Sequence, residues 1–181
     1  MIEFPISKAF QFIEPGPVVL VSTAHKGKAN VMTLSWHTVI DFTPLIGCVI
    51  GPWDWSYNAL MATRECVIAV PTVDLLEKVV DIGNCSGKDV DKFARFGLTP
   101  MPAKDVKAPL IAECLANIEC RVVDTTLTDK YGLSILEGVR AWIDPDRKER
   151  RTCHANGDGT FVVDGETIDL KERMVKWQDT F

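Results

Sequence analysis

The apolar positions in the first third of the chain fall into short runs that predict buried strands. Residues 18–23 form a β-branched run, and the uninterrupted apolar run at 45–50 predicts a strand buried on both faces. A polar segment at 25–28 contains a glycine and separates the first run from a second strand over 30–35. These first two strands are therefore expected to form a hairpin.

The middle of the chain adds a fourth strand and three short helices. The strand covers 66–70 and is stopped by Pro71. Helices are predicted over 57–64 with Asp54 or Ser56 as N-cap, from Thr72 or Asp74 to about Ile82, and from Asp89 to a C-cap at Gly97. The apolar stripe expected on the second helix consists of Leu75, Leu76, Val79 and Val80.

The second half of the chain returns to β patterns. Residues 99–110 are rich in proline and lysine and are expected to be an extended connector. Residues 116–123 alternate, with Asn117, Glu119 and Arg121 on the face predicted to meet solvent. Further strands are expected over 132–143 and 161–163, with a hairpin turn at 156–159 and a last short helix from Asp169 to Trp177.

The order of these elements predicts a fold that is mainly β with short helices. Six or more strands are expected, and no strand–helix–strand unit repeats, which argues against a doubly wound parallel sheet. Antiparallel strands in this number usually close into a barrel or a sandwich. No flexible linker or change of composition divides the chain, so residues 1–181 are interpreted as one domain.

Composition and charge exclude several function classes. The chain is 46% hydrophobic with a net charge of −5, which indicates a globular protein without the basic face of a nucleic-acid binder. The basic cluster at 147–151 is interpreted as a solvated turn. No apolar run approaches the ~18 residues of a membrane span, and residues 1–10 do not resemble a signal peptide. Six cysteines without a C-x-x-C pair favour reduced thiols, so we expect a cytoplasmic location.

Familiar catalytic and phosphate-binding motifs are absent from the sequence. The segment GNCSGK at 83–88 has three residues between its glycines where a Walker A loop has four, and Asp89 stands in place of the Ser or Thr. No G-x-G-x-x-G or G-x-S-x-G occurs. The adjacent Cys153 and His154 are poorly placed to bind one ion together, so no metal site is predicted and no catalytic residue is assigned.

The stretch from Asn30 to Asn58 carries the strongest chemical signal. Hydroxyl, amide and indole groups cluster at its two ends: Asn30, Thr33, Ser35 and Trp36 at one, Ser56, Tyr57 and Asn58 at the other. If the flanking strands pair, these groups meet in one crevice, which suits the flat ring and the phosphate of a flavin. The alternative is that Trp36 is a core residue, Ser56 an ordinary N-cap and Lys92 a surface lysine.

An ordered set of motifs runs along the chain: PGPVVLVST, NVMTLSW, PLIGCVIGPWDWSYNAL, ECVIAVPT, SGKDVDKF with GLTP, and KAPLIAECLANIECRVV. This set resembles the flavin-reductase-like, FMN-binding split-barrel family. The resemblance spans about residues 15–161 and is strongest to the flavoredoxin branch. It implies a Greek-key split β-barrel, a homodimer, and FMN bound non-covalently near the dimer interface. Exposed Trp53 and Trp55 are candidate interface anchors.

The resemblance also assigns site residues. The residues expected to contact the flavin are Asn30, Met32, Thr33, Leu34, Ser35 and Trp36. Those expected on the phosphate and ribityl side are Ser56, Tyr57 and Asn58. Lys92 is expected near the ring or the phosphate and Phe161 over the ring, with Tyr131 as a weaker candidate. Trp53-Asp54-Trp55 occupies a corner where many relatives carry a basic residue. This departure leaves the mode of phosphate binding open.

The function implied by the resemblance is an FMN-dependent oxidoreductase. The electron donor is expected to be either NAD(P)H or a partner protein, and fold analogy does not choose between them. Two alternatives remain open: a flavin-binding or interaction protein without turnover, and a structural barrel that has lost its ligand.

Overall fold

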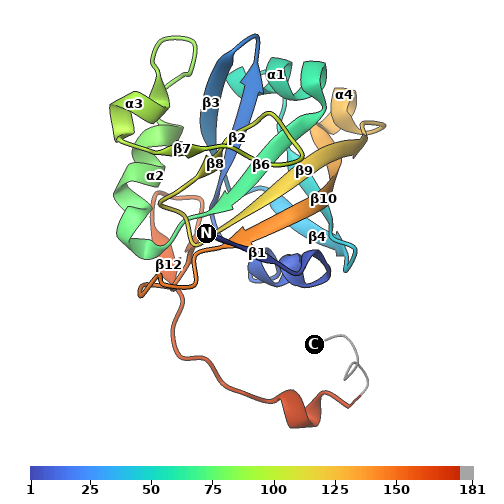
Figure 1. Ribbon diagram of the computed structural model, residues 1–181, viewed down its shortest axis with the longest axis vertical. Helices are drawn as coiled ribbons and strands as arrows, with labels where there is room; N and C mark the ends of the chain where they lie inside the picture. The colour runs from blue at the N-terminus through green and yellow to red at the C-terminus, as the bar shows by residue number, and fades with distance from the viewer. Residues whose placement is uncertain (176–181) are drawn as a thin grey trace.

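The computed structural model describes residues 1–175 and shows one large antiparallel sheet flanked by short helices (Figure 1). The sheet runs in the order β3-β2-β6-β9-β10-β5-β4, and β1 pairs with β10. Its strands are β1 Ile2–Phe4, β2 Val19–His25, β3 Lys28–Leu34, β4 His37–Asp41, β5 Leu45–Val49, β6 Glu65–Val70, β9 Ala116–Asp124 and β10 Leu133–Ile143.

The remaining elements are short, and most lie on the sides of this sheet, whereas η3 follows an extended C-terminal segment and lies away from the sheet (Figure 1). The helices are η1 Ile6–Phe12, α1 Trp55–Thr63, η2 Val73–Leu75, α2 Leu76–Gly83, α3 Lys92–Phe96, α4 Thr128–Tyr131 and η3 Lys171–Arg173. Two small hairpins join β7 Pro100–Met101 to β8 Leu110–Ile111 and β11 Cys153–Ala155 to β12 Phe161–Val163. None of the helices within residues 1–175 has the length and apolar character needed to cross a membrane.

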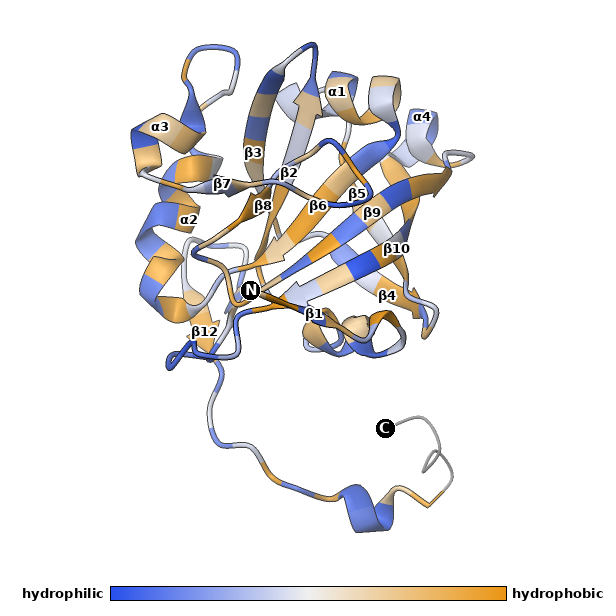
Figure 2. Cartoon of the chain, viewed as in Figure 1, coloured by the Kyte–Doolittle hydropathy of each residue, from blue (hydrophilic) through white to orange (hydrophobic). Residues whose placement is uncertain are grey.

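Two apolar clusters hold the sheet and its helices together. The first fills the inside of the curled sheet and takes residues from β2, β5, β6, β9 and β10, together with Leu60 of α1. The second lies between the outer side of β2 and β3 and the helices α2 and α3, where Val79, Ile82 and Phe93 pack. Figure 2 shows hydrophilic positions among hydrophobic ones along β9 and β10, and both kinds of residue on α2. A sheet that encloses its own core and remains open between β3 and β4 is a split barrel, which confirms the expected fold class.

Several sequence predictions are confirmed at the level of single turns. β2 and β3 form the expected hairpin, and its turn residues Lys26 and Gly27 both have positive φ, as tight hairpin turns require. Gly97 ends α3 in the left-handed conformation at φ 59°. The six cysteines are all free thiols, and five of them are buried.

Element boundaries needed correction. The prediction missed β4, and it began the first helix at residue 57 and the third at Asp89, whereas α1 begins at Trp55 and α3 at Lys92. On α2 the fully buried positions are Val79 and Ile82, while Leu76 and Val80 are only partly covered. Of the helix predicted from Asp169 to Trp177, the described part, residues 169–175, contains the single turn η3, and Trp177 lies outside the described residues.

The exposed face predicted for residues 116–123 is wrong for its first half. Asn117 and Glu119 are both 0% exposed, because the connector at 99–110 folds back over this part of β9. The Glu119 carboxylate accepts hydrogen bonds from the backbone N–H groups of Lys104, Asp105 and Val106. It also accepts one from the indole of Trp142 at 2.7 Å. The carboxylate therefore fastens the connector to the barrel.

Candidate functional site

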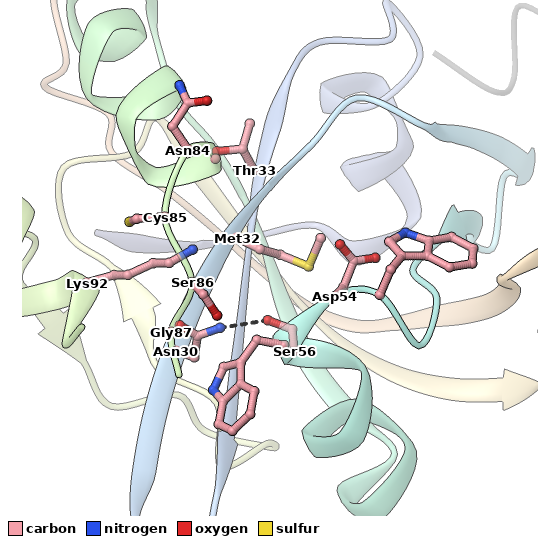
Figure 3. A pocket seen from close by; sticks show the side chains of 13 residues that line it. Asn30, Met32, Thr33, Asp54, Ser56, Asn84, Cys85, Ser86, Gly87 and Lys92 are labelled. Atoms are coloured by element: carbon pink, nitrogen blue, oxygen red, sulfur yellow. Dashed lines mark hydrogen bonds between the residues drawn. The ribbon is translucent and has the colours of Figure 1, made fainter. Parts of the chain in front are cut away.

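A pocket of about 430 Å³ opens beside β3 (Figure 3). Ligand sites commonly measure about 300–1,000 Å³, so this volume admits a cofactor-sized molecule. The lining residues are Asn30, Met32, Thr33, Trp53, Asp54, Trp55, Ser56, Gly83, Asn84, Cys85, Ser86, Gly87 and Lys92. They come from β3, the corner before α1 and its first turn, the end of α2 with the loop after it, and the first turn of α3.

The wall formed by β3 is the edge of the sheet. Within the described residues β3 pairs with β2 on one side and with no strand on the other. An unpaired strand edge presents backbone N–H and C=O groups that a bound molecule can satisfy. Thr33 ties this edge to α2, because its hydroxyl donates to the carbonyl oxygen of Val79 at 2.6 Å.

A buried hydrogen bond joins β3 to α1 at the floor of the pocket. The side-chain amide of Asn30 donates to the hydroxyl of Ser56 at 2.9 Å, and both residues are at least nine-tenths buried. Gly87 approaches this pair so closely that a Cβ at position 87 would collide with the Asn30 amide and lie 2.8 Å from Trp55 Cδ1. Any larger residue at position 87 would have to displace the Asn30 amide or the Trp55 ring, so glycine allows the loop after α2 to lie against them.

Lys92 supplies a buried positive charge. Asp91 caps α3 by accepting from Ala94 N at 3.1 Å, which places Lys92 in the first turn of the helix. Lys92 is 5% exposed, and its ammonium donates to the carbonyl oxygen of Ile82 at 2.8 Å. Burial lowers its pKa, while the nearby Cys85 and Asp54 act in the opposite direction. Because an ammonium has three N–H groups, Lys92 retains donors for a ligand.

The first turn of α1 also faces the pocket. Asp54 stands at the N-cap position, but its side chain makes no hydrogen bond to the helix. Its Oδ2 instead accepts from Gly51 N at 3.0 Å, within the Gly-Pro-Trp-Asp corner. The amide groups of the first turn are thus left without a side-chain cap, and such a helix end favours an anion.

The predicted site residues divide into two groups. Those that line the pocket are Asn30, Met32, Thr33, Ser56 and Lys92. Those outside it are Leu34 and Tyr57, which pack on the barrel core; Ser35, Trp36, Asn58 and Tyr131, which are exposed; and Phe161, which packs near α2 and α3. The flavin contacts assigned to this second group stay predictions.

The alternative interpretation of three site residues is wrong. Trp36 is 70% exposed and is not a core residue, and Lys92 is buried and is not a surface lysine. Ser56 lies inside α1, whose N-cap is Asp54. Its hydroxyl accepts from Asn30 and does not serve as an ordinary cap.

Sequence reasoning missed the wall formed by residues 83–87. This segment lacks the Walker spacing and is predicted only to be a loop, yet it lies in the pocket because α2 packs against β3 and ends beside it. The available signal was local: two glycines enclose small polar residues directly after an amphipathic helix. That pattern allows close approach of a backbone to a ligand without following a known motif.

Comparison with known proteins identifies the family of the chain. The family model described as flavin reductase like domain matches residues 13–161. The solved FMN-binding domain of a flavin reductases-like enzyme from Shewanella baltica OS155 is 26% identical, with a TM-score of 0.86 and coverage of 93% of this chain and 96% of that one. Flavoredoxin of Desulfovibrio vulgaris (Miyazaki F), at 22% identity, TM-score 0.77 and coverage of 85% and 89%, shows the same fold.

A sequence relative is found in Archaeoglobus fulgidus. This uncharacterized protein is 40% identical over 111 residues, which cover 61% of this chain. The match spans 63% of the length of that relative.

Proposed function

The chain belongs to the flavin reductase-like domain family, and from this premise we propose that it is a flavin-dependent oxidoreductase that binds FMN non-covalently in the pocket beside β3. The observation that carries the proposal is the pairing of a buried ammonium, Lys92, with the uncapped first turn of α1 at one pocket. A buried cation and an open helix end both favour an anionic group.

The residues present fit the phosphate end of FMN. Ser56 and the backbone of α1 would contact the phosphate from one side, and Lys92 from the other. The Asn30–Ser56 hydrogen bond holds the hydroxyl in place. The loop 83–87 lines the pocket, and its backbone N–H groups would add donors for the phosphate.

The ring end would extend along the free edge of β3 toward Trp36. Backbone groups of residues 33–35 would supply donors and acceptors for the polar edge of the ring, and Trp36 a flat apolar contact. The indole of Trp36 is exposed, so it is available to a ligand or to a second subunit. Tyr57, Asn58 and Phe161 remain candidate contacts on this proposal.

FMN, when bound, would supply the electron-carrying chemistry, and the protein would orient it and exclude water. No side chain needs to act as nucleophile or general base. The donor is either NAD(P)H or a protein. A flavin-binding protein without NAD(P)H turnover is the second candidate.

We also propose that the protein is a homodimer. An apolar strip lies on the outer side of β4, β5 and β10: Ile40 packs beside Gly47 and Leu133, and Trp53 beside Gly132 and Val49. Leu133 and Val49 are direct partners in the sheet, so the strip is continuous. Ile40 and Trp53 are 49% and 70% exposed, which suits a surface covered by a second copy.

The oligomeric state tests the dimer directly. Light scattering should give twice 20.1 kDa for the wild type and 20.1 kDa for Ile40→Asp, because a charge in the strip opposes burial. Val162→Asp introduces the same charge at a residue that is also exposed but lies in the β11–β12 hairpin, and it should remain dimeric. A monomeric wild type at micromolar concentration would contradict the proposal.

Anaerobic addition of NADH or NADPH to the FMN-loaded protein tests the activity. Bleaching of the bound flavin on mixing identifies a pyridine-nucleotide reductase. A flavin that binds but stays oxidised with both nucleotides, and is reduced by dithionite, indicates the electron-transfer or non-turnover candidate.

A further inference from the structure

An acidic side chain faces the part of the pocket that is otherwise suited to an anion. The titratable residues lining the pocket within the described chain are Asp54, Cys85 and Lys92. Asp54 lies at the start of α1 and Lys92 at the start of α3, and Figure 3 shows their charged groups entering the pocket from opposite sides. A phosphate bound there would meet a carboxylate as well as an ammonium.

The position of the Asp54 carboxylate is fixed by the corner before α1. Its Oδ2 accepts from Gly51 N, and Asp54 N donates to Gly51 O at 2.9 Å. No hydrogen bond to Oδ1 is found in the part of the chain that the structure describes. The carboxylate thus has one oxygen held by the corner and one available, at a helix end that stabilises negative charge.

We propose that Asp54 is an internal competitor of the ligand phosphate, so that a phosphate dianion binds in this pocket only together with one proton. This inference rests on the proposed binding of FMN. Without a ligand, the carboxylate supplies the negative charge that Lys92 and the α1 end attract. With a phosphate present, the two anions share the same positive groups and repel each other.

Taking up one proton relieves that repulsion. A phosphate monoester carries about −1.5 to −2 charges at neutral pH. The positive charge of Lys92 and of one helix end is enough to balance this charge only if Asp54 adds no negative charge of its own. Burial already raises the pKa of Asp54, although the hydrogen bond from Gly51 and the charge of Lys92 lower it in part. A nearby phosphate would raise it further, so the proton goes to the carboxylate or to the phosphate it faces.

The coupling would make the pocket discriminate between flavins by charge. Riboflavin has no phosphate, so its affinity should be independent of Asp54 and of pH. FMN should bind more weakly as pH rises, by about tenfold per unit where free FMN is a dianion and free Asp54 is ionised. The protein would then exchange FMN readily at alkaline pH.

The experiment compares the wild type with Asp54→Asn by titration with FMN and with riboflavin between about pH 6 and pH 8.5. Asparagine keeps an oxygen that accepts from Gly51 N and removes the charge. Asp81→Asn, at an exposed position of α2 near the loop, makes the same change of net charge outside the pocket. Calorimetry in two buffers of different ionisation enthalpy measures the protons taken up on binding.

The expected result is that Asp54→Asn binds FMN at least about tenfold more tightly than the wild type at the alkaline end, and that the two proteins converge at the acidic end. Asp81→Asn should behave as the wild type. FMN binding that is independent of pH, or a pH slope that persists in Asp54→Asn, would overturn the inference while leaving the proposed function intact. Failure of both flavins to bind the wild type would overturn the proposed function and the inference with it.

Discussion

The side-chain amide of Asn30 on β3 lies 2.9 Å from the hydroxyl of Ser56 on α1, and this buried hydrogen bond joins two segments that are 26 residues apart in the chain. It sets the distance between the strand edge and the helix end, and both of these features line the pocket. This hydrogen bond is therefore a contact of the pocket whose removal can be measured separately from unfolding.

Replacement of Asn30 tests that contact. Asn30→Ala should weaken FMN binding about tenfold, or ~1.4 kcal/mol, because the Ser56 hydroxyl loses its fixed orientation. The free energy of unfolding should fall by about 1 kcal/mol. Asn156→Ala, at an exposed position after β11 where the amide donates to the Thr160 hydroxyl, should leave the affinity within about twofold. Equal effects of the two changes on FMN titration would place the ligand elsewhere.

Lys92 is expected to oppose folding and to favour ligand binding. Lys92→Met keeps the apolar stem and removes the charge, so FMN affinity should fall about tenfold or more while the apoprotein becomes no less stable. Lys88→Met, at an exposed position of the adjoining loop, is the matched control and should change neither property. A lower stability of the apoprotein with unchanged affinity would mean that Lys92 has only a structural role.

The lowered pKa of Lys92 also predicts a pH dependence of stability. Because burial lowers the pKa in the folded state below 10.5, the unfolded chain binds more protons in the interval between the two values. The contribution of Lys92 to the free energy of unfolding should therefore rise as pH increases toward 10.5. Urea denaturation at several alkaline pH values should show this rise in the wild type relative to Lys92→Met, and parallel curves would contradict it.

Replacement of Trp36 tests whether this residue is a surface contact for the ligand or a core residue of the barrel. Because Trp36 is 70% exposed, Trp36→Ala should change the free energy of unfolding by no more than about 0.5 kcal/mol. If the indole borders the ring, FMN affinity should fall about tenfold. Circular dichroism confirms the fold, and an FMN titration measures the affinity. Native affinity in Trp36→Ala would move the ring away from this end of β3.

Glu119 is predicted to be a structural carboxylate. Glu119→Gln places an amide N–H against backbone N–H donors at 99–110, so we expect a loss of about 2–3 kcal/mol in the free energy of unfolding. Glu137→Gln, on the exposed face of β10, should be neutral. Equal stabilities in urea denaturation would show that the connector is held by its apolar contacts alone.

Local patterns in the sequence predicted the elements whose structure is determined locally. The β2–β3 hairpin follows from apolar runs around a glycine turn, and the end of α3 follows from Gly97. β4 was missed because HTVID is short and mostly exposed, and its pairing with β5 carries a register shift near Asp41. The burial of Glu119 was missed because the segment that covers it is distant in sequence.

In the candidate site, too, some residues could be assigned from the sequence and others depend on segments that are distant in the chain. Asn30, Thr33 and Ser56 could be assigned from the resemblance, but the part played by Gly87 depends on how α2 directs the following loop onto β3. The acidic Asp54 belongs to a departure from the family pattern that is visible in the sequence. Its competition with a phosphate could be inferred only after the structure placed it opposite Lys92.

The central claim, that this pocket binds FMN, is tested most directly by the absorption spectrum of the protein after incubation with excess FMN and removal of free flavin. The account predicts a yellow protein with close to one flavin per chain, released as FMN on heat denaturation, and a much lower flavin content in Lys92→Met under the same conditions. A colourless wild-type protein with a native circular dichroism spectrum would contradict it.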